Sequence, residues 1–334
     1  MRSRALISGR TGLPFPASTP APVRRMNALV PVFALVFAVV AIATAQPAAP
    51  AVATKRGEDA RLSPSFHAVT TAPGLPRVAA LEPRVWACDF ASQALGRPMR
   101  FLIVLPEGAS LGGTRVPVVY FLHGRGRHER TLLEDAITRP VVLAARFAIV
   151  LPRGQDGWYV NAPAAPADRF ADYLDEVLAT AEEQFPVSRE AAGRAIGGWS
   201  MGGYGATYTA GRRAGDFAAV ASLIGVIDFP RAPVGEPSQN YAVPARFGTD
   251  PDGWRPLNPR LRLPRLRGTP HFIAYADQAF ERQMNEVFIA DARALGIEVE
   301  VLRLSGGHTF PMVEQSLPAA LAFLERQLLP AAKR

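Results

Sequence analysis

The chain of 334 residues has a single cysteine, Cys88, and only five histidines. One cysteine excludes an intramolecular disulfide, so the fold must be stabilised by its core. Cys88 lies in an alternating, strand-like run at residues 85–90. We therefore expect a buried apolar residue there rather than a nucleophile. Five histidines leave few candidates for a catalytic base or a metal ligand.

Glycine and proline, with 28 and 31 residues, together stay below the share that is typical of a collagen-like or low-complexity disordered chain, which excludes those classes. Acidic residues are missing from the first 45 positions, which hold five arginines. These arginines account for much of the net charge of +8. The remaining chain is only mildly basic, so we expect no nucleic-acid partner.

Only one long hydrophobic run is present, at residues 28–45, directly after the pair Arg24 and Arg25. It ends in Ala43-Thr44-Ala45, a pattern of small residues typical of a signal-peptide cleavage site. We predict a signal peptide over residues 1–45 and a secreted or periplasmic protein. The alternative is an uncleaved membrane anchor, because about 18 apolar residues can just span a bilayer. Residues 46–75 are rich in alanine and proline and are interpreted as a linker.

From residue 76 onward, apolar strand-like runs alternate with helical patterns, which predicts an α/β fold with a mainly parallel sheet covered on both faces. We interpret residues 76–334 as one catalytic domain. Residues 226–268 are rich in proline and arginine without a clear period, and we expect an irregular insertion over one sheet edge, a candidate lid. The expected strands are residues 99–105, 116–122, 147–151, 194–199, 217–224, 271–276 and 297–304, and the expected helices are 168–185, 278–295 and 312–329.

The motif Gly198-Trp199-Ser200-Met201-Gly202 follows an expected strand and opens an expected helix. A nucleophile on such a sharp turn needs small neighbours, because the strand and helix backbones nearly collide there. The helix N-terminus also directs N–H groups and positive dipole at the site, which favours an oxyanion. We therefore predict that Ser200 is a nucleophile.

A serine nucleophile needs a base and a group that orients the base. His308 lies in a glycine-rich loop after the last expected strand, from which it can reach back over the carboxyl edge of the sheet. Asp277 ends the strand at 271–276 and is the predicted acid, in the order Ser, Asp, His. Asp228 is the alternative acid, and capping of the following helix is a competing role for Asp277.

The strand that ends at Leu122 continues into His123-Gly124-Arg125. The loop after this strand and the residue after the nucleophile supply the two oxyanion N–H groups of such a fold. We assign them to the backbones of Arg125 and Met201. His123 is interpreted as a structural residue, and His123 with His128 lacks the spacing and acidic partners of a metal pair. No phosphate-binding loop or dinucleotide fingerprint is present, so we expect no cofactor and no metal.

With these residues in place, the chain resembles the esterase D branch of the α/β-hydrolases. This group includes S-formylglutathione hydrolases, feruloyl esterases and the antigen 85 mycolyltransferases. The resemblance covers about residues 84–328 and is carried by the segments 95–99, 122–124, 156–159, 198–205, 247–248 and 307–308, together with Trp254 and Asp277. Two departures are Trp199, where leucine is usual, and Arg125, whose counterpart is often apolar.

The resemblance implies an exported serine carboxylic-ester hydrolase that works through a Ser-His-Asp triad and an acyl-enzyme. It implies a small-molecule or polysaccharide-linked ester as the substrate, and a membrane association only if the N-terminal segment stays uncleaved. We expect the aromatic residues Trp158, Tyr159, Trp199 and Trp254 to line the substrate cleft. The alternatives are an acyltransferase of the mycolyltransferase type and a non-catalytic cell-surface protein with the same fold.

Overall fold

A computed structural model of the chain describes residues 76–231 and 242–329. The predicted signal peptide and linker, at residues 1–75, lie outside the described residues. So does the central part of the predicted insertion, at 232–241. Among the described helices, none combines the length and the apolar character needed to cross a bilayer.

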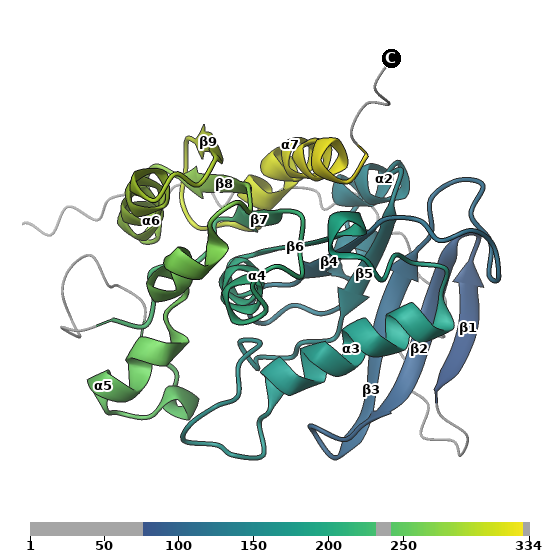
Figure 1. Cartoon of the computed structure of the whole chain (residues 1–334), viewed down its shortest axis with the longest axis horizontal. Coiled ribbons are helices and arrows are strands. Elements are labelled where there is room, and N and C mark those ends of the chain that lie inside the picture. Colours follow the sequence, from purple (N-terminus) through teal and green to yellow (C-terminus); the bar gives the residue numbers. More distant parts are fainter. Residues whose placement is uncertain (1–75, 232–241, 330–334) are drawn as a thin grey trace, which may run out of the picture. The chain divides into compact units, whose positions relative to one another are not determined.

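The described strands form one sheet in the order β1-β2-β3-β5-β4-β6-β7-β8-β9 (Figure 1). The first three strands, β1 (Arg77–Glu82), β2 (Val85–Ser92) and β3 (Arg97–Val104), are antiparallel to their neighbours. The other strands run parallel to one another, as the apolar runs of the sequence predict. They are β4 (Val118–Leu122), β5 (Ala148–Pro152), β6 (Arg194–Trp199), β7 (Val220–Leu223), β8 (His271–Ala276) and β9 (Val299–Leu304). The expected α/β-hydrolase fold is confirmed.

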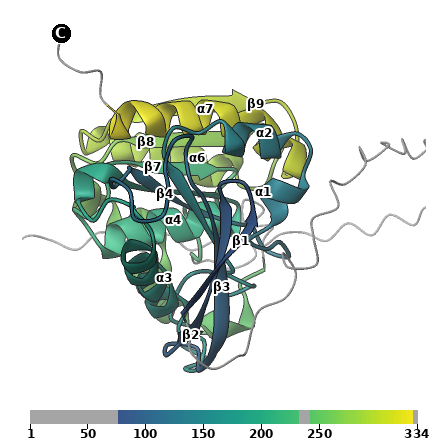
Figure 2. The ribbon, with the colours of Figure 1, turned by 90° about the vertical axis from the view of Figure 1, so that its right-hand side faces the viewer.

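Helices cover both faces of this sheet (Figure 2). Two buried hydrophobic clusters form on its two sides, because successive side chains of each strand point to opposite faces. In β4, for example, Tyr120 belongs to one cluster and Phe121 to the other. The first cluster includes buried residues of α3 (Phe170–Gln184), α4 (Met201–Arg212) and α6 (Arg282–Ala294). The second includes those of α1 (Thr131–Glu134), α2 (Thr138–Leu143) and α7 (Phe310–Leu328).

Most elements lie where the residue pattern predicts them, with one consequential difference. Helix α3 buries the predicted apolar stripe, including Tyr173 and Val177. Cys88 is a fully buried free thiol in β2, and burial, with a smaller effect of Asp89, raises its pKa to about 12. Helix α6, however, begins at Arg282 rather than at 278. The residues between β8 and α6 form turns instead, and this changes which acid reaches the site.

The predicted insertion is irregular in its described part, but it packs on helices rather than over a sheet edge. It contains α5 (Pro251–Trp254) and the short 3-10 helices η3 (Ala245–Phe247), η4 (Arg255–Leu257) and η5 (Pro259–Leu266). Another 3-10 helix, η2 (Ala191–Gly193), lies outside the insertion, just before β6. Segment η5 contacts α4 and α6. The Tyr204 hydroxyl in α4 donates to the Leu257 carbonyl at 2.7 Å, and Arg260 pairs with Asp291 of α6 at 2.6 Å. The correction follows from the buried apolar residues of this stretch, which join the core beside α4.

His271 opens β8 as a fully buried side chain, and burial lowers its pKa to about 4. Because the folded-state pKa is below the ordinary value of 6.5, the unfolded chain binds the proton more tightly. Stability should therefore fall as pH drops from about 6.5 toward 4, by up to about 3 kcal/mol from this group. We expect His271→Asn, which can still donate to the Thr269 carbonyl, to flatten this part of the curve. Urea unfolding across that pH range measures it, and an equally steep loss in the variant would contradict the expectation.

Candidate active site

Ser200 sits on a strained turn between β6 and α4. Its backbone has φ 54° and ψ −117°, in the left-handed region that a non-glycine residue rarely adopts. The Ser200 N–H donates to Leu223 O of β7 at 2.9 Å, and its carbonyl accepts from Tyr204 N at 3.0 Å. These bonds to the sheet and to the helix hold the turn, so the hydroxyl projects at the carboxyl edge of the parallel strands.

Glycines beside Ser200 permit this close approach of backbones. A Cβ on Gly202 would lie 2.0 Å from the Leu122 carbonyl oxygen of β4, and one on Gly198 would lie 2.5 Å from the same atom. No rotamer change can relieve these contacts, because the obstructing atom belongs to a sheet backbone. The predicted need for small residues in the motif thus has a specific cause, the packing of the turn against the end of β4.

Gly202→Ala should therefore destabilise the protein by about 3 kcal/mol or more and displace Ser200. Urea unfolding measures the first effect, and ester hydrolysis the second. Gly253→Ala is the matched control, because its added Cβ would meet no atom closer than 3.6 Å. If both substitutions lowered stability equally, the close approach at β4 would not be the cause.

The structure brings Ser200 and His308 together. The Ser200 Oγ and His308 Nε2 atoms are 2.8 Å apart, although the residues are 108 positions apart in sequence. His308 lies on the loop between β9 and α7, which the glycine-rich sequence 305–307 allows to turn back over the sheet. The Phe280 ring packs on the imidazole with centroids 4.6 Å apart. This geometry is that of a hydroxyl nucleophile and its general base.

The acid on the other side of His308 is Glu281, not the predicted Asp277. Glu281 Oε2 lies 2.9 Å from His308 Nδ1, and the Glu281 side chain is fully buried. Asp277 instead accepts the Gly306 N–H at 3.1 Å and lies 3.7 Å from Arg303. It anchors the loop that carries His308 without facing the imidazole.

The turn before α6 is the physical reason for this exchange. The Gln278 N–H donates to Gly306 O at 2.8 Å, and the Arg282 N–H donates to Ala279 O at 3.2 Å. These bonds prevent a helix from starting at 278 and carry Glu281 to the imidazole. The sequence does hold one signal for the exchange, a second carboxylate four residues after Asp277. The predicted helix, which begins at 278, includes that carboxylate.

The alternative acid, Asp228, is also placed away from His308. It is buried and accepts hydrogen bonds from Asn258 Nδ2 at 2.9 Å and from Arg231 Nη1 at 3.0 Å. Asn258 belongs to the insertion, and it also donates to Pro230 O at 3.1 Å. Asp228 thus connects the beginning of the insertion, just after β7, to its later part.

The loop after β4 passes directly beside the nucleophile. A Cβ on Gly124 would lie 3.3 Å from Ser200 Cβ and 2.8 Å from Trp199 Nε1. The loop turns through a bond from Arg127 N to Gly124 O, and Gly126 N donates to Asp156 Oδ1 at 2.8 Å. Arg125 lies in this loop, and Met201 is the first residue of α4. The loop segment and Met201 therefore both border Ser200. Their assignment as oxyanion donors stays a prediction.

His123 holds this loop from inside the protein, as the sequence pattern suggests. Burial lowers its pKa to about 4, so the ring is neutral at pH 7. Its Nε2 accepts the Gly154 N–H at 2.8 Å, which assigns the proton to Nδ1, and Nδ1 then donates to Gly124 O at 2.8 Å. The Tyr159 hydroxyl donates to the His123 carbonyl at 3.2 Å.

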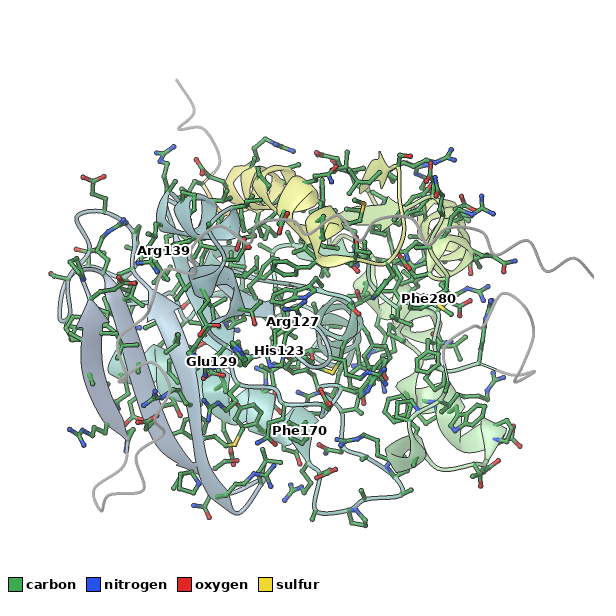
Figure 3. The ribbon with its side chains drawn as sticks, turned by 180° about the vertical axis from the view of Figure 1, so that it is seen from behind. His123, Arg127, Glu129, Arg139, Phe170 and Phe280 are labelled. Carbon is green, nitrogen blue, oxygen red and sulfur yellow. The ribbon has the colours of Figure 1, made fainter. Side chains whose placement is uncertain are left out.

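A buried ion pair anchors the far end of the same loop. The Glu129 carboxylate accepts two hydrogen bonds from Arg153, at 2.6 and 2.9 Å, and one from Arg130 at 3.2 Å. Burial would raise the pKa of Glu129, but the bonds and charge of Arg153 outweigh it and lower the pKa. Figure 3 shows His123 and Glu129 close together in the interior, with Arg127 on the side of α7. Sequence reasoning missed this pair because it joins two loops.

The four aromatic residues predicted to line a cleft are all buried in the structure, which corrects that prediction. Trp158 packs edge-on against Tyr204 with centroids 5.2 Å apart, and Trp254 Nε1 donates to Gly248 O at 3.1 Å. Tyr159 supports the loop after β4, and Trp199 packs on Phe310 at 6.0 Å. Large apolar side chains are removed from water wherever the core can accept them. Tyr159 and Trp199 are thus buried beside the loop after β4 and the Ser200 turn, whereas Trp158 and Trp254 belong to the core.

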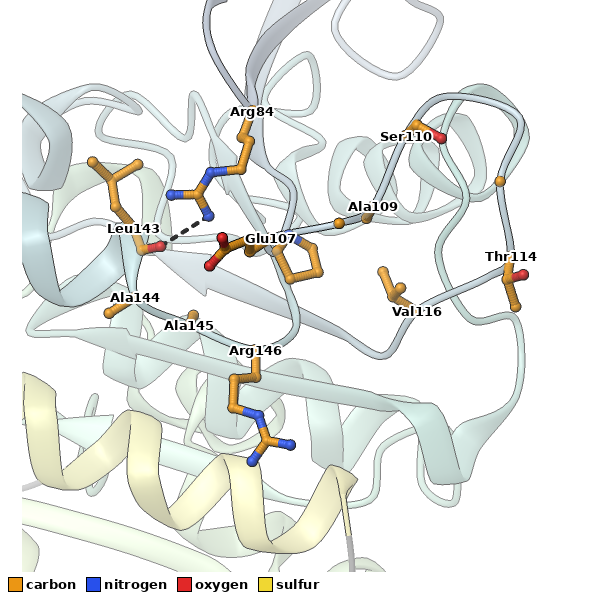
Figure 4. A pocket seen from close by; sticks show the side chains of 13 residues that line it. Arg84, Glu107, Ala109, Ser110, Thr114, Val116, Leu143, Ala144, Ala145 and Arg146 are labelled. Carbon is orange, nitrogen blue, oxygen red and sulfur yellow. Dashed lines mark hydrogen bonds between the residues drawn. The ribbon is translucent and has the colours of Figure 1, made fainter.

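A cavity of about 690 Å³ lies at the opposite edge of the sheet. It is bordered by the end of β3, the segment before β4 and the end of α2, and includes Arg84, Glu107 and Arg146 (Figure 4). Arg84 Nη1 donates to the Leu143 carbonyl there at 3.0 Å. The cavity contains none of the residues around Ser200. Within the described ranges, no three His, Cys, Asp or Glu side chains are grouped as metal ligands.

The fold is that of an α/β-hydrolase. At its site a serine is hydrogen-bonded to a histidine, which is in turn hydrogen-bonded to a glutamate. Comparison with known proteins agrees on the fold and gives the family. The sequence profile of the family described as "Putative esterase" matches residues 92–324, and the chain belongs to this family.

Relatives and solved structures extend the comparison. Esterase Rv1288 of Mycobacterium tuberculosis is 31% identical over 149 residues, which cover 43% of this chain and 33% of that protein. The chain thus aligns with about a third of the length of this curated relative. Serine hydrolase FphF of Staphylococcus aureus has a TM-score of 0.61 at 18% identity, covering 72% of this chain and 97% of that one. S-formylglutathione hydrolase of Agrobacterium tumefaciens has a TM-score of 0.62 at 17% identity, covering 75% and 98%. At these identities the solved structures support the fold.

Proposed function

We propose that the protein is a serine esterase that hydrolyses carboxylic esters through an acyl-enzyme on Ser200. One observation carries the proposal: Ser200 Oγ, His308 and Glu281 form a continuous chain of hydrogen bonds of 2.8 and 2.9 Å. Membership of an esterase family supports it. The strained backbone of Ser200 supports it as well, because such strain persists at functional turns.

The mechanism follows from the two hydrogen bonds of the His308 ring. His308 Nε2 accepts the Ser200 proton as Oγ attacks the ester carbonyl, while Nδ1–H donates to Glu281. The imidazolium that forms then faces a buried carboxylate, which stabilises its charge. His308 returns the proton to the leaving alcohol, and water attacks the acyl-enzyme with His308 again as the base.

The negative oxygen of the tetrahedral intermediate needs donors beside Ser200. We assign this role to the backbone N–H groups of Arg125 and Met201. Met201 is the first residue of α4, and the first N–H groups of a helix lack acceptors within it. One such donor typically contributes about 2.7–4 kcal/mol to lowering the barrier. The role of Arg125 is independent of its side chain.

Trapping the acyl group tests the proposal. A short-chain 4-nitrophenyl ester should give a burst of nitrophenol equal to the enzyme concentration when deacylation is slower than acylation. After acid quenching, mass spectrometry of the peptides should place the acyl group on Ser200. An acyl group on another residue would overturn the assignment. Repeating the reaction with added sugar alcohols compares water with other acyl acceptors and so tests the transferase alternative.

We also propose that the protein is exported, on the basis of the apolar run at 28–45 and its Ala43-Thr44-Ala45 end. Its substrate would then be a small-molecule or polysaccharide-linked ester outside the cytoplasm. Cell fractionation followed by N-terminal sequencing of the mature protein tests this proposal. A cytoplasmic protein that retains residues 1–45 would overturn it.

A further inference from the structure

Arg127 places an exposed guanidinium at the rim of the proposed active site. Its backbone N–H donates to Gly124 O at 3.1 Å, which closes the turn beside Ser200. Two bonds from the neighbouring residues, Gly126 to Asp156 and His123 to Gly124, hold the same turn. The base of the Arg127 side chain is therefore fixed relative to the nucleophile.

The guanidinium is held on the other side by the start of α7. Its central carbon lies 5.0 Å from the centre of the Phe310 ring. Phe310 follows His308 by two positions and packs on Trp199, the residue before Ser200. Figure 3 shows Arg127 beside His123, on the side of the yellow helix α7. Stacking on an aromatic face orients an arginine but leaves its positive charge available.

Nearby carboxylates are engaged with other partners. Glu129 is taken by Arg153 and Arg130, and Glu134 pairs with Arg130 at 2.8 Å. Asp156 accepts the Gly126 N–H. Across residues 76–231 and 242–329, Arg127 has no carboxylate within ion-pair distance, whereas Arg139, Arg153 and Arg212 all have one. The Arg127 guanidinium is thus left without an ion-pair partner among the described residues.

We propose that Arg127 binds an anionic group of the substrate, so that the enzyme prefers esters bearing a carboxylate or phosphate near the scissile bond. The inference rests on the proposed esterase function and names its substrate class. A guanidinium presents paired N–H donors that match the two oxygens of such an anion. The anion can be attached through the acyl group or through the alcohol, and paired substrates distinguish the two.

The test measures kcat/KM for matched neutral and anionic esters. On the acyl side, 4-nitrophenyl hexanoate is compared with 4-nitrophenyl monoadipate. On the alcohol side, the hexanoate of 5-hydroxy-2-nitrobenzoic acid is compared with the hexanoate of its methyl ester. The wild-type protein is compared with Arg127→Gln, Arg127→Lys and Arg77→Gln. Arg77 is an exposed arginine on the edge strand β1, so its variant matches the change in net charge.

We expect Arg127→Gln to lower the ratio of anionic to neutral kcat/KM by roughly ten- to a hundredfold on one side of the ester bond. Arg127→Lys should recover part of the ratio, and Arg77→Gln should keep the wild-type value. Added salt should reduce the ratio in the wild-type protein more than in Arg127→Gln.

An unchanged ratio in Arg127→Gln, or an equal loss in Arg77→Gln, would overturn the Arg127 proposal while ester hydrolysis by the wild-type protein still stood. If the folded wild-type protein hydrolysed neither the neutral nor the anionic esters, both proposals would fall. The two failures are therefore distinguishable.

Discussion

Replacing Ser200 with alanine is expected to reduce kcat for ester hydrolysis by about four to six orders of magnitude. The hydroxyl 2.8 Å from His308 is the atom that would form the acyl bond, and no other group on the turn replaces it. Activity above the rate in water should survive, because binding and the oxyanion donors remain. Stopped-flow or endpoint assays with a chromogenic short-chain ester measure the loss.

Ser110→Ala is the matched control for the Ser200 prediction. Ser110 is an exposed serine at the cavity on the opposite edge of the sheet, so its loss should leave turnover unchanged. Thermal unfolding of both variants separates loss of chemistry from loss of fold. Equal turnover by Ser200→Ala and the wild-type protein would remove the nucleophile from the proposed mechanism.

Glu281→Gln should lower kcat by about three to four orders of magnitude. The amide is close in size to the carboxylate but carries no charge to stabilise the His308 imidazolium. It can also present an N–H to Nδ1 and so favour the wrong tautomer. Steady-state hydrolysis of a chromogenic short-chain ester measures this loss.

Asp277→Asn is the companion variant, because it tests the acid that the sequence pattern favoured. The asparagine oxygen can still accept the Gly306 N–H, so the loop that carries His308 should keep its position. We expect a loss of kcat of less than about tenfold, since only the exposed contact with Arg303 is weakened. A larger loss in Asp277→Asn than in Glu281→Gln would return the orienting role to Asp277.

The difference between these two acids shows where inference from sequence reaches its limit. The strand at 271–276 and the loop at 305–308 were both predictable, and each places a side chain at the carboxyl edge of the sheet. Which carboxylate reaches the imidazole depends on the turn between Ala276 and Arg282. That turn is set by the bond from Gln278 N to Gly306 O, a contact between segments about thirty residues apart.

The aromatic residues illustrate the same limit in another form. Trp158 lies in a segment that carries the family resemblance, and Trp254 carries it as well. The chemistry of both residues suits a cleft as well as a core. Both are almost fully buried, beside residues of the insertion such as Phe247. Residue type alone does not distinguish a cleft from a core. It determines how much apolar surface a side chain has, but not which neighbouring residues cover that surface.

The sequence by itself determined the alternation of strands and helices, the serine on its glycine-lined turn and the histidine on the last loop, because these features depend on local periodicity and on backbone sterics. Only the tertiary structure decided that Glu281 hydrogen-bonds His308, that the four aromatic residues pack into the core, and that Arg127 stacks on Phe310 without a carboxylate partner among the described residues. Each of these is a contact between distant segments, and such contacts depend on how the packed elements are positioned against one another, which no local pattern records.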